Sequence, residues 1–573
     1  MKATITTILL IATAALLTTP IETLAQGSDT LVVSAMPPGN LNTVIIADTA
    51  AGRNPNRVYV LQQTGSVDTT YYITAYIPTD FNLTIVGKTN PVTGHPPVIA
   101  PFILANNSAP TQFIRPTGSC TITLRNLYIE GHRPDSLKAL QRITFGSADS
   151  VTYILDHDVF SDLNNVDAMW EHGNYNSIFM KNCEVRNCNG PGWQGLAWFW
   201  AISGVPVDTA EFVNNTFFLM ARSIIGELQY AKYFLLDHNT FFLNASEPLV
   251  LPQATNAVIQ NNIFYGLFAH GADSAQVKGN LFTNDAQGPA ILMFDSLTSV
   301  ANPPYSLTEA QRNVVVRNND YFWPKAFYDN WAALSDTASS NGPGIIVQPS
   351  WMNVETAAMF ANHTSWPGLV ATNNDSVDPG YAYAIVGPAV DSLIHSIDAN
   401  WTGAVTHGFF WQPSTAPFDV FNSVARNWAN TQSYPVPENL AYTNDSLQMA
   451  GTGKYALGDL NWFPSQLKEW EAGGVNAIKG NGPQVPTKFD LSQNYPNPFN
   501  PSTNISVSLN QSGAMSLRIY NVLGQLVDVV AHGYRAAGNY IFNVNMDHYA
   551  SGVYFYTLKQ GSNIMTKKML LLK

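Results

Sequence analysis

Apolar and polar residues alternate in a short phrase that recurs between residues 120 and 322. Residues 236–244 read LDHNTFFLN, and variants such as ILDHDVF, FVNNTFF, IQNNIF and VRNNDYF stand upstream and downstream. Aligned on their Asn or Asp, the phrases give eight anchor positions: Asn126, Asp158, Asn182, Asn215, Asn239, Asn262, Asn280 and Asn319. Because alternation with period two is typical of half-buried strands, each phrase predicts two short strands joined by a turn at the anchor.

Two apolar columns accompany the anchors. An aromatic residue lies two positions after the anchor at Tyr128, Phe160, Phe217, Phe241, Phe264, Phe282 and Tyr321. An apolar residue lies three positions before it at Leu155, Phe179, Phe212, Leu236, Ile259, Val277 and Val316. Where no loop is inserted, the phrase repeats roughly every 24 residues, which is a solenoid period, and the alternation excludes helical repeats. We therefore predict an all-β parallel β-helix, with the Asn column as a hydrogen-bonded ladder at the turns and the aromatic column facing the core.

The chain departs from this pattern at both ends. Residues 1–26 combine Lys2 with the apolar run ILLIATAALL, which predicts a signal peptide and is too short to span a bilayer. We assign residues 27–350 to the β-helix, residues 351–480 to an irregular segment that packs on or caps the helix, and residues 481–488 to a linker. Residues 489–573 alternate strand patterns with Gly and Asn turns, and they predict a small C-terminal β-sandwich.

Composition narrows the choice of partners. Charged residues make up 12% of the chain, compared with about 25% in a typical globular protein. The formal net charge of −12 argues against nucleic acid as a partner, because a phosphate backbone requires a basic surface. It also disfavours acidic sugars unless a cation or a local basic patch intervenes. Cys120, Cys183 and Cys188 are too few for a disulfide scaffold, and we interpret them as buried core residues, with a Cys183–Cys188 bridge as the alternative.

Two parts of the chain resemble known families. Residues 57–73 (RVYVLQQTGSVDTTYYI), the PPVIAPF that follows and the eight phrases resemble the pectate-lyase-like group of right-handed parallel β-helices. This resemblance implies a secreted protein that holds polysaccharide or acts on it. Near the C-terminus, YPNPFNPST and the final KKMLLLK resemble the C-terminal sorting domain of proteins exported by the bacterial type IX secretion system. That resemblance implies passage across the outer membrane through the type IX machinery, followed by release or attachment at the cell surface.

The first resemblance also implies a calcium site. In pectate lyases of this fold, a DH phrase on an early coil supplies carboxylate ligands for calcium. The corresponding candidates in this chain are Asp156, Asp158, Asp167 and Glu171. Arg222, in the segment LMARSIIGEL, stands where the family usually has a basic lysine. The segment NASEPLVLPQA replaces the arginine-rich segment of the lyases and contains no arginine, so we assign no catalytic residue and require no cofactor.

A tryptophan-rich insertion supplies the other candidate contacts. The segment GPGWQGLAWFWAISG contains Trp193, Trp198 and Trp200, and sugar rings commonly stack on such side chains. The alternative interpretation is a hydrophobic cap over the side of the helix. We predict a monomeric, secreted or cell-surface protein that binds or processes extracellular polysaccharide, and a catalytically active polysaccharide lyase or glycoside hydrolase remains the alternative.

Overall fold

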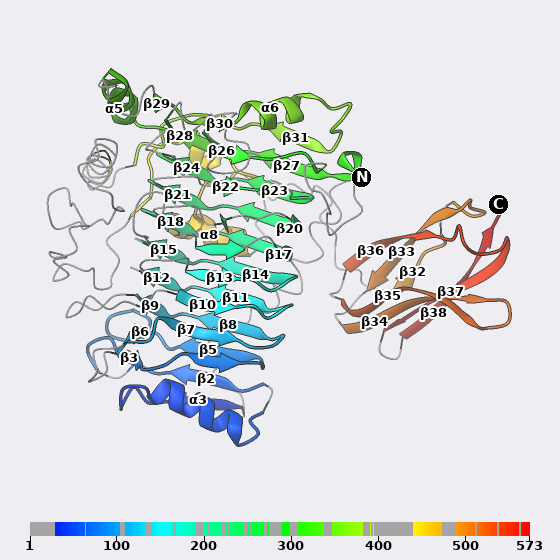
Figure 1. Cartoon of the computed structure of the whole chain (residues 1–573), viewed down its shortest axis with the longest axis horizontal. Helices are drawn as coiled ribbons and strands as arrows, with labels where there is room; N and C mark the ends of the chain where they lie inside the picture. The colour runs from blue at the N-terminus through cyan, green and yellow to red at the C-terminus, as the bar shows by residue number, and fades with distance from the viewer. Residues whose placement is uncertain are drawn as a thin grey trace. The chain divides into compact units, whose positions relative to one another are not determined.

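The described residues form two compact units, a larger one within residues 29–472 and a smaller one within residues 488–572. The computed structural model describes residues 29–54, 56–63, 65–102, 109–131, 140, 142–161, 163, 168–186, 188, 199–202, 205–220, 225–226, 230–244, 249–251, 254–268, 272–273, 289–297, 308–336, 346–381, 390, 394, 439–472, 488–494, 496–509, 513–535, 538–560 and 563–572. Each unit has its own hydrophobic core, and Figure 1 shows the strands and helices of both.

The larger unit is built on three parallel sheets, which we name A, B and C. Sheet A contains β1 (Thr30–Val33), β2 (Val58–Leu61), β5 (Leu83–Gly87), β8 (Thr121–Arg125), β11 (Thr152–Asp156), β14 (Asn176–Lys181), β17 (Pro206–Val213), β20 (Tyr230–Asp237), β23 (Asn256–Gln260), β27 (Asn313–Arg317) and β31 (Leu369–Thr372). Sheet B contains β3 (Thr70–Ile73), β6 (Val98–Pro101), β9 (Tyr128–Glu130), β12 (Val159–Ser161), β15 (Glu184–Arg186), β18 (Thr216–Phe218), β21 (Thr240–Phe242), β24 (Ile263–Tyr265) and β28 (Asp320–Phe322). Sheet C contains β4 (Ile77–Thr79), β7 (Gln112–Pro116), β10 (Arg142–Gly146), β13 (Met169–Glu171), β16 (Trp200–Ile202), β19 (Ile225–Gly226), β22 (Leu249–Val250), β26 (Ala290–Met293) and β30 (Ser350–Met352).

The order of these strands makes the unit a parallel β-helix, as predicted. From β2 to β30, each coil contributes one strand to sheet A, then one to sheet B, then one to sheet C, and each strand pairs in parallel with its counterpart in the next coil, while β1 and β31 extend sheet A at its two ends. Helices and one antiparallel strand pair complete the described part of the unit: α3 (Asn40–Ala50), η3 (Glu309–Gln311), α5 (Lys325–Asp336), α6 (Val354–Ala361), η5 (Leu447–Met449), η6 (Leu460–Trp462), α8 (Pro464–Glu471) and the pair β25 (Ala272–Asp273) and β29 (Ile346–Val347). Helix α3 buries Leu41 and Ile45 in the core at the first coil, so it covers the end of the stack (Figure 1).

A hydrogen-bonded ladder runs along the turns between sheets A and B. At each rung, a side chain accepts the backbone N–H of the aligned residue in the preceding coil; the accepting residues are Asp158, Cys183, Asn215, Asn239, Asn262, Asn319 and Asn374. From Asn215 to Asn374 the side-chain amides also bond to one another. Each such amide further donates to a backbone carbonyl of the coil before it, as Asn239 does to Phe212 O at 2.9 Å. The predicted structural ladder is therefore confirmed.

The structure corrects the alignment of three anchors. Asn126 and Asn182 lie one residue before the ladder column, whose members in those coils are Leu127 and Cys183. They belong instead to a column of left-handed residues with φ between 52° and 59°: Asn126, His157, Asn182, Asn214, His238, Asn261, Asn318 and Asn373. Asn280 lies outside the described residues, and β23 pairs directly with β27, so no coil intervenes there. The sharp bend and the ladder thus fall on two adjacent columns rather than one.

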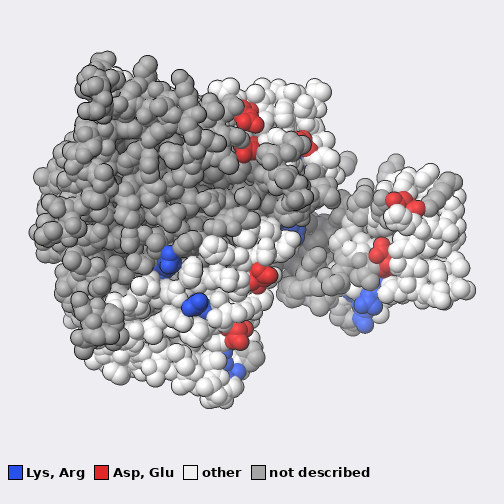
Figure 2. All heavy atoms as spheres, viewed as in Figure 1, with Lys and Arg blue, Asp and Glu red and all other residues white. Residues whose placement is uncertain are grey.

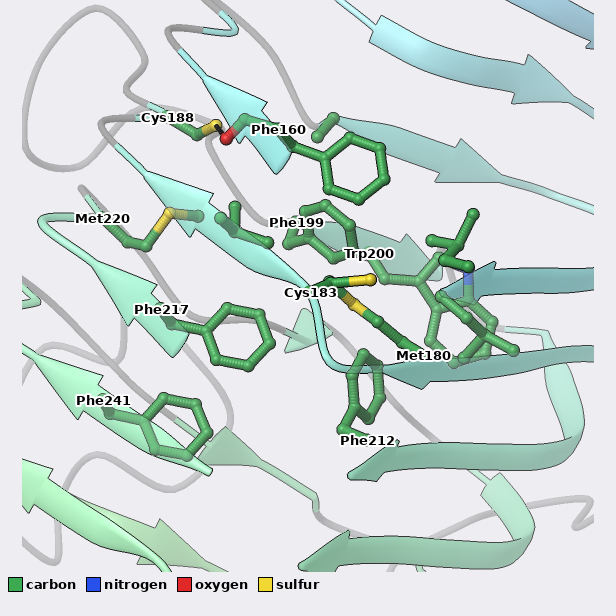
Figure 3. Packing of buried hydrophobic residues seen from close by; sticks show 14 of the residues in the cluster. Phe160, Met180, Cys183, Cys188, Phe199, Trp200, Phe212, Phe217, Met220 and Phe241 are labelled. Carbon is green, nitrogen blue, oxygen red and sulfur yellow. Dashed lines mark hydrogen bonds between the residues drawn. The ribbon is translucent and has the colours of Figure 1, made fainter. Parts of the chain in front are cut away.

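The aromatic column faces the core at Phe160, Phe217, Phe241, Phe264 and Tyr321, as predicted. Phe217 stacks on Phe241 at a ring separation of 5.0 Å, and Phe241 stacks on Phe264 at 4.9 Å. Figure 3 shows Phe160, Phe217 and Phe241 succeeding one another from strands of sheet B. The one-residue shift corrects two members of the predicted columns. Tyr128 pairs in register with Val159, whereas Phe160 pairs with Ile129, and Phe179 pairs with Ile154, whereas Leu155 pairs with Met180. Tyr128 and Phe179 therefore point to the opposite face from the column residues of the neighbouring coils. Val277 and Phe282 lie outside the described residues.

The β-helix continues beyond residue 350, where the sequence pattern predicts its end. Strand β30 closes sheet C and β31 closes sheet A, and Asn374 extends the ladder by one more rung. Residues 439–472, here called the strap, then run back along the A–B turns. Thr452 bonds to Asn261, and the distant end of the strap reaches Lys181 through Glu471 at 3.1 Å. The strap therefore packs along the side of the β-helix and covers A–B turns.

The smaller unit is an antiparallel β-sandwich, as predicted. One sheet contains β32 (Asp490–Leu491), β33 (Ser502–Leu509) and β36 (Gly538–Asn545), and the other contains β35 (Leu526–Arg535), β34 (Gly513–Asn521), β37 (Gly552–Gln560) and β38 (Asn563–Leu571). Leu491, Val507, Leu517, Tyr556 and Met569 are among the residues of its core. Tyr556 also donates to Ser492 O at 2.8 Å, which ties the start of the unit to β37.

Cys120, Cys183 and Cys188 are buried thiols, so the alternative Cys183–Cys188 bridge does not form. None of the helices in the described ranges is long and apolar enough to span a membrane. Figure 2 shows charged side chains scattered singly over the described part of the visible face, which agrees with the low charged fraction of the sequence.

Candidate functional site

Asp158 is a structural member of the A–B turn. Its side chain is fully buried, with Oδ1 accepting the N–H of Leu127 at 2.9 Å and Oδ2 accepting the N–H of Asp156 at 3.2 Å. Burial raises the pKa of this carboxyl well above its usual range. Both oxygens therefore accept backbone N–H groups, and the bond from Leu127 is the one that asparagines accept in later coils.

Asp156 ends β11 and is also committed to neighbouring groups. Its Oδ1 lies 2.7 Å from Nδ1 of His157, and its Oδ2 lies 3.7 Å from Nε of Arg125. The Asp156 side chain and Arg125 are both buried, whereas His157 is about half exposed. Asp156 thus joins two stacked coils through an ion pair to Arg125. Of these three side chains, His157 is the one in contact with water.

The remaining calcium candidates lie elsewhere in the chain. Glu171 ends β13 in sheet C, across the coil from the turn that carries Asp156 and Asp158, and its side chain is outside the described part. Asp167 also falls outside the described residues. Among the His, Cys, Asp and Glu side chains that are described, no group of three or more could hold a metal ion. The four-carboxylate calcium site stays a prediction.

Trp200 is a core residue and not a sugar-stacking surface, which corrects the prediction made from its loop. Its side chain is fully buried, and its ring centre lies 6.4 Å from that of Phe212. Figure 3 shows it among Met180, Cys183 and Phe212, directed into the stack. The physical reason is its place in strand β16, where Trp200 pairs in register with the core residue Met169 and shares its inward direction. Trp193, Trp198 and Arg222 lie outside the described residues.

A different candidate surface for ligand binding lies on sheet C, on the first coils of the β-helix. We name it the aromatic–arginine row: Tyr76, Arg115, Arg142, Phe145 and His172. The guanidinium of Arg115 lies 5.5 Å from the ring centre of Tyr76, and both side chains are exposed. The guanidinium of Arg142 lies 4.9 Å from the ring centre of Phe145, whose edge contacts His172 at 6.2 Å between ring centres.

The coil geometry assembles this row from residues that are distant in the sequence. Tyr76 directly precedes β4, Arg115 belongs to β7 and Phe145 to β10, and these strands are neighbours in sheet C. Each step between coils is about 4.8 Å, so the row extends over roughly 14 Å from the coil of Tyr76 to that of His172. Planar guanidinium groups beside aromatic rings offer hydrogen-bond donors and apolar faces together, which is a combination suited to sugars or carboxylates. The row could not be predicted from the sequence, because its residues come from different coils and form no motif within one short segment.

A second unusual feature is Glu211, on the outer face of sheet A. Alternation along β17 directs Phe212 into the core and Glu211 to the opposite face, where it pairs in register with Phe179 and Leu235. Glu211 is 3% exposed, and its Oε1 has no hydrogen-bond partner within the structure as described. Burial raises the pKa of this carboxyl to about 8. An acidic group is therefore held in its neutral form between apolar neighbours at neutral pH.

We expect Glu211→Gln to stabilise the protein at alkaline pH. An unfolded glutamate loses its proton near about pH 4.3, whereas the folded carboxyl keeps it until about pH 8. The free energy of unfolding of the native chain therefore falls as pH rises between these values, and the loss persists above them. The gain of the variant over the native chain should be about 3 to 5 kcal/mol larger at pH 9 than at pH 5, as measured by denaturant unfolding at both pH values.

The matched control for this prediction is Asp208→Asn. Asp208 lies in the same strand and forms an exposed ion pair with Lys232 at 2.8 Å, so its removal should produce no gain that grows with pH. Equal pH profiles for the native chain and Glu211→Gln would contradict the assignment of Glu211 as a buried neutral acid.

Comparison with known proteins concerns the smaller unit. Residues 493–572 match the family described as the secretion system C-terminal sorting domain. No curated protein matches the chain. The matched residues include every strand of the sandwich from β33 to β38. The chain thus carries a type IX sorting domain, which confirms that prediction and marks a protein that is secreted or attached to the outer cell surface.

Proposed function

We propose that the β-helix unit binds an extracellular polysaccharide along the aromatic–arginine row after the type IX machinery has exported the protein. The observation that carries the proposal is the repeated placement of a guanidinium beside an aromatic ring on neighbouring coils, at Tyr76 with Arg115 and at Phe145 with Arg142. The sequence resemblance to pectate-lyase-like β-helices supports the same class of ligand. Export to the cell exterior supports it as well, because polysaccharide is available there.

The charges of the row favour an acidic polysaccharide. The chain carries a net charge of −12, so an acidic ligand needs a local basic surface. Arg115 provides one, since it is exposed and forms no ion pair with an acid among the described residues. A guanidinium can donate two parallel hydrogen bonds to a carboxylate, while aromatic faces contact the apolar side of a sugar ring. We therefore expect carboxylated polysaccharides to bind more tightly than neutral ones.

The aromatic–arginine row is tested with the double variant Tyr76→Ala, Arg115→Ala of the mature chain. It should bind acidic polysaccharides about ten-fold more weakly than the native chain or worse, because it loses one ring and one guanidinium of the row. Affinity electrophoresis or calorimetry with a panel of acidic and neutral polysaccharides measures the difference. Arg317→Ala is the control, since Arg317 is exposed in sheet A, away from the row, and its guanidinium bonds to Gln260 Oε1 at 2.8 and 2.9 Å. Unchanged affinity in the double variant, with unchanged melting temperature, would exclude this site.

The same panel separates binding from catalysis. Incubation with and without calcium, followed by assay of reducing ends and unsaturated products, tests the alternative of a polysaccharide lyase or glycoside hydrolase. Product formation would assign an enzyme, and binding without products would assign a binding protein. Calorimetric titration of the native chain with calcium alone tests the predicted ligands Asp156, Asp158, Asp167 and Glu171, whatever the outcome with sugars.

A further inference from the structure

The smaller unit displays uncharged apolar side chains at the tip of its β34–β35 hairpin. Val522 is 66% exposed, Leu523 is 78% exposed and Leu526 is 49% exposed, and we name these residues the apolar tip. None of them belongs to the core of the unit or packs against it. No charged residue occurs from position 519 to position 527, so the tip stands in an uncharged stretch of sequence.

The backbone of this tip is fixed by several hydrogen bonds. Oδ1 of Asn521 accepts the N–H groups of Leu523 and Gln525, both at 3.0 Å. The N–H of Asn521 donates to Gln525 O at 3.0 Å, and the N–H of Gly524 donates to Asn521 O at the same distance. Gly524 has φ of 77°, a left-handed value that glycine adopts without steric cost. The tip is therefore a defined turn that holds its apolar side chains outward, and not a loop that can fold them against the sandwich.

We propose that the apolar tip is the surface by which a protein of the type IX secretion machinery holds the sorting domain. Exposed clusters of apolar residues on a rigid turn mark interaction sites, because their burial in a partner is favourable and loses little conformational freedom. The proposal rests on the sorting-domain assignment, which requires a protein partner to read this unit. The tip gives that partner a recognisable feature whose formation depends on the folded hairpin.

Two other occupants fit the tip less well. A lipid surface normally requires basic residues beside the apolar ones, and the nearest residues in sequence supply none. A second copy of the chain would pair two small tips, and three side chains are far fewer than the 20 to 30 or so residues a side that a stable interface uses. An apolar pocket of a secretion protein, engaged briefly during export, needs no larger area.

The test compares two substitutions at exposed apolar positions of the same unit. In a type IX-competent host, the full chain with Val522→Ser and Leu523→Ser should show at least a ten-fold loss of protein outside the cell and a matching accumulation inside. Ile564→Ser is the control, because Ile564 is 58% exposed in β38 and lies outside the apolar tip. Leu523→Met should be exported normally, since it keeps an apolar side chain.

The outcomes distinguish this inference from the export assignment. If the double variant is exported at the native level while deletion of the whole sorting domain blocks export, the apolar tip is not the docking surface. If the double variant loses its cooperative unfolding transition, Leu523→Gln alone replaces it, because that side chain has no core contact. Tip-dependent sedimentation of the purified mature chain with phosphatidylethanolamine and phosphatidylglycerol vesicles, or tip-dependent dimers in size-exclusion chromatography, would overturn the proposal in favour of a lipid or a second copy.

Discussion

Deletion of residues 487–573 is expected to leave the chain inside a type IX-competent host, with none of it outside the cell. The matched sorting domain occupies residues 493–572, so the variant lacks the segment that directs passage across the outer membrane. The β-helix should still fold, because the two units have separate hydrophobic cores. Immunoblots of periplasmic and extracellular fractions measure the effect, and thermal unfolding of the retained protein checks the fold.

A fusion provides the complementary control. Residues 487–573, placed after a signal peptide and an ordinary periplasmic reporter, should carry the reporter out of the cell. Normal extracellular levels of the truncated chain would show that another segment directs export. A reporter fusion that stays in the periplasm would show that the sorting domain is required but not sufficient.

Phe241→Ala is expected to lower the free energy of unfolding by about 3 to 5 kcal/mol, the range for truncation of a core phenylalanine. Phe241 is fully buried, and its ring stacks on Phe217 at 5.0 Å and on Phe264 at 4.9 Å. Removal of the ring leaves a cavity between two coils whose backbone pairing prevents them from closing. Denaturant unfolding of the native and variant chains measures the difference.

Two comparison variants make this result specific. Asn239→Ala should cost about 1 to 3 kcal/mol, because Asn215 N–H and Asn262 Oδ1 each lose a bond that no other side chain replaces. Val354→Ala, at a 70% exposed position of α6, should change stability by less than about 0.5 kcal/mol. A neutral Phe241→Ala would mean that this column does not carry the packing of the core.

The sequence predicts the middle coils well because each carries every repeated feature. The coils of Asn215, Asn239 and Asn262 have the ladder residue, the aromatic two positions later and the apolar residue three positions earlier, and all three alignments are correct. The final rung at Asn374 was missed because Ser376 stands where the aromatic would be. The rung at Cys183 was misaligned because a thiol replaces the amide and an adjacent Asn182 resembles the anchor.

The candidate sites were harder to predict for a different reason. Asp156 and Asp158 resemble metal ligands in sequence, yet backbone donors and a buried arginine use their oxygens in the folded coil. Whether a strand residue such as Trp200 faces the core or solvent depends on its register with the neighbouring strand. The sequence around Trp200 contains no repeated phrase from which this register could be predicted. Tyr76 and Arg115 are neighbours only because β4 pairs with β7. Which residues of two coils meet depends on the length of the loops inserted between their strands, and amino-acid composition does not reveal these lengths.

The strap changes how the β-helix would respond to a pulling force. In an unsupported solenoid each coil touches only its neighbours, so coils can peel from a free end one at a time. Here Asp459 bonds to Thr216 and Thr240, and Glu471 pairs with Lys181, across sequence separations of 243, 219 and 290 residues. Tension applied at residue 472 would therefore act first on the strap bonds, which lie at coils far from the last one. A protein tethered at the cell surface by its C-terminal side would detach the strap before it began to unwind.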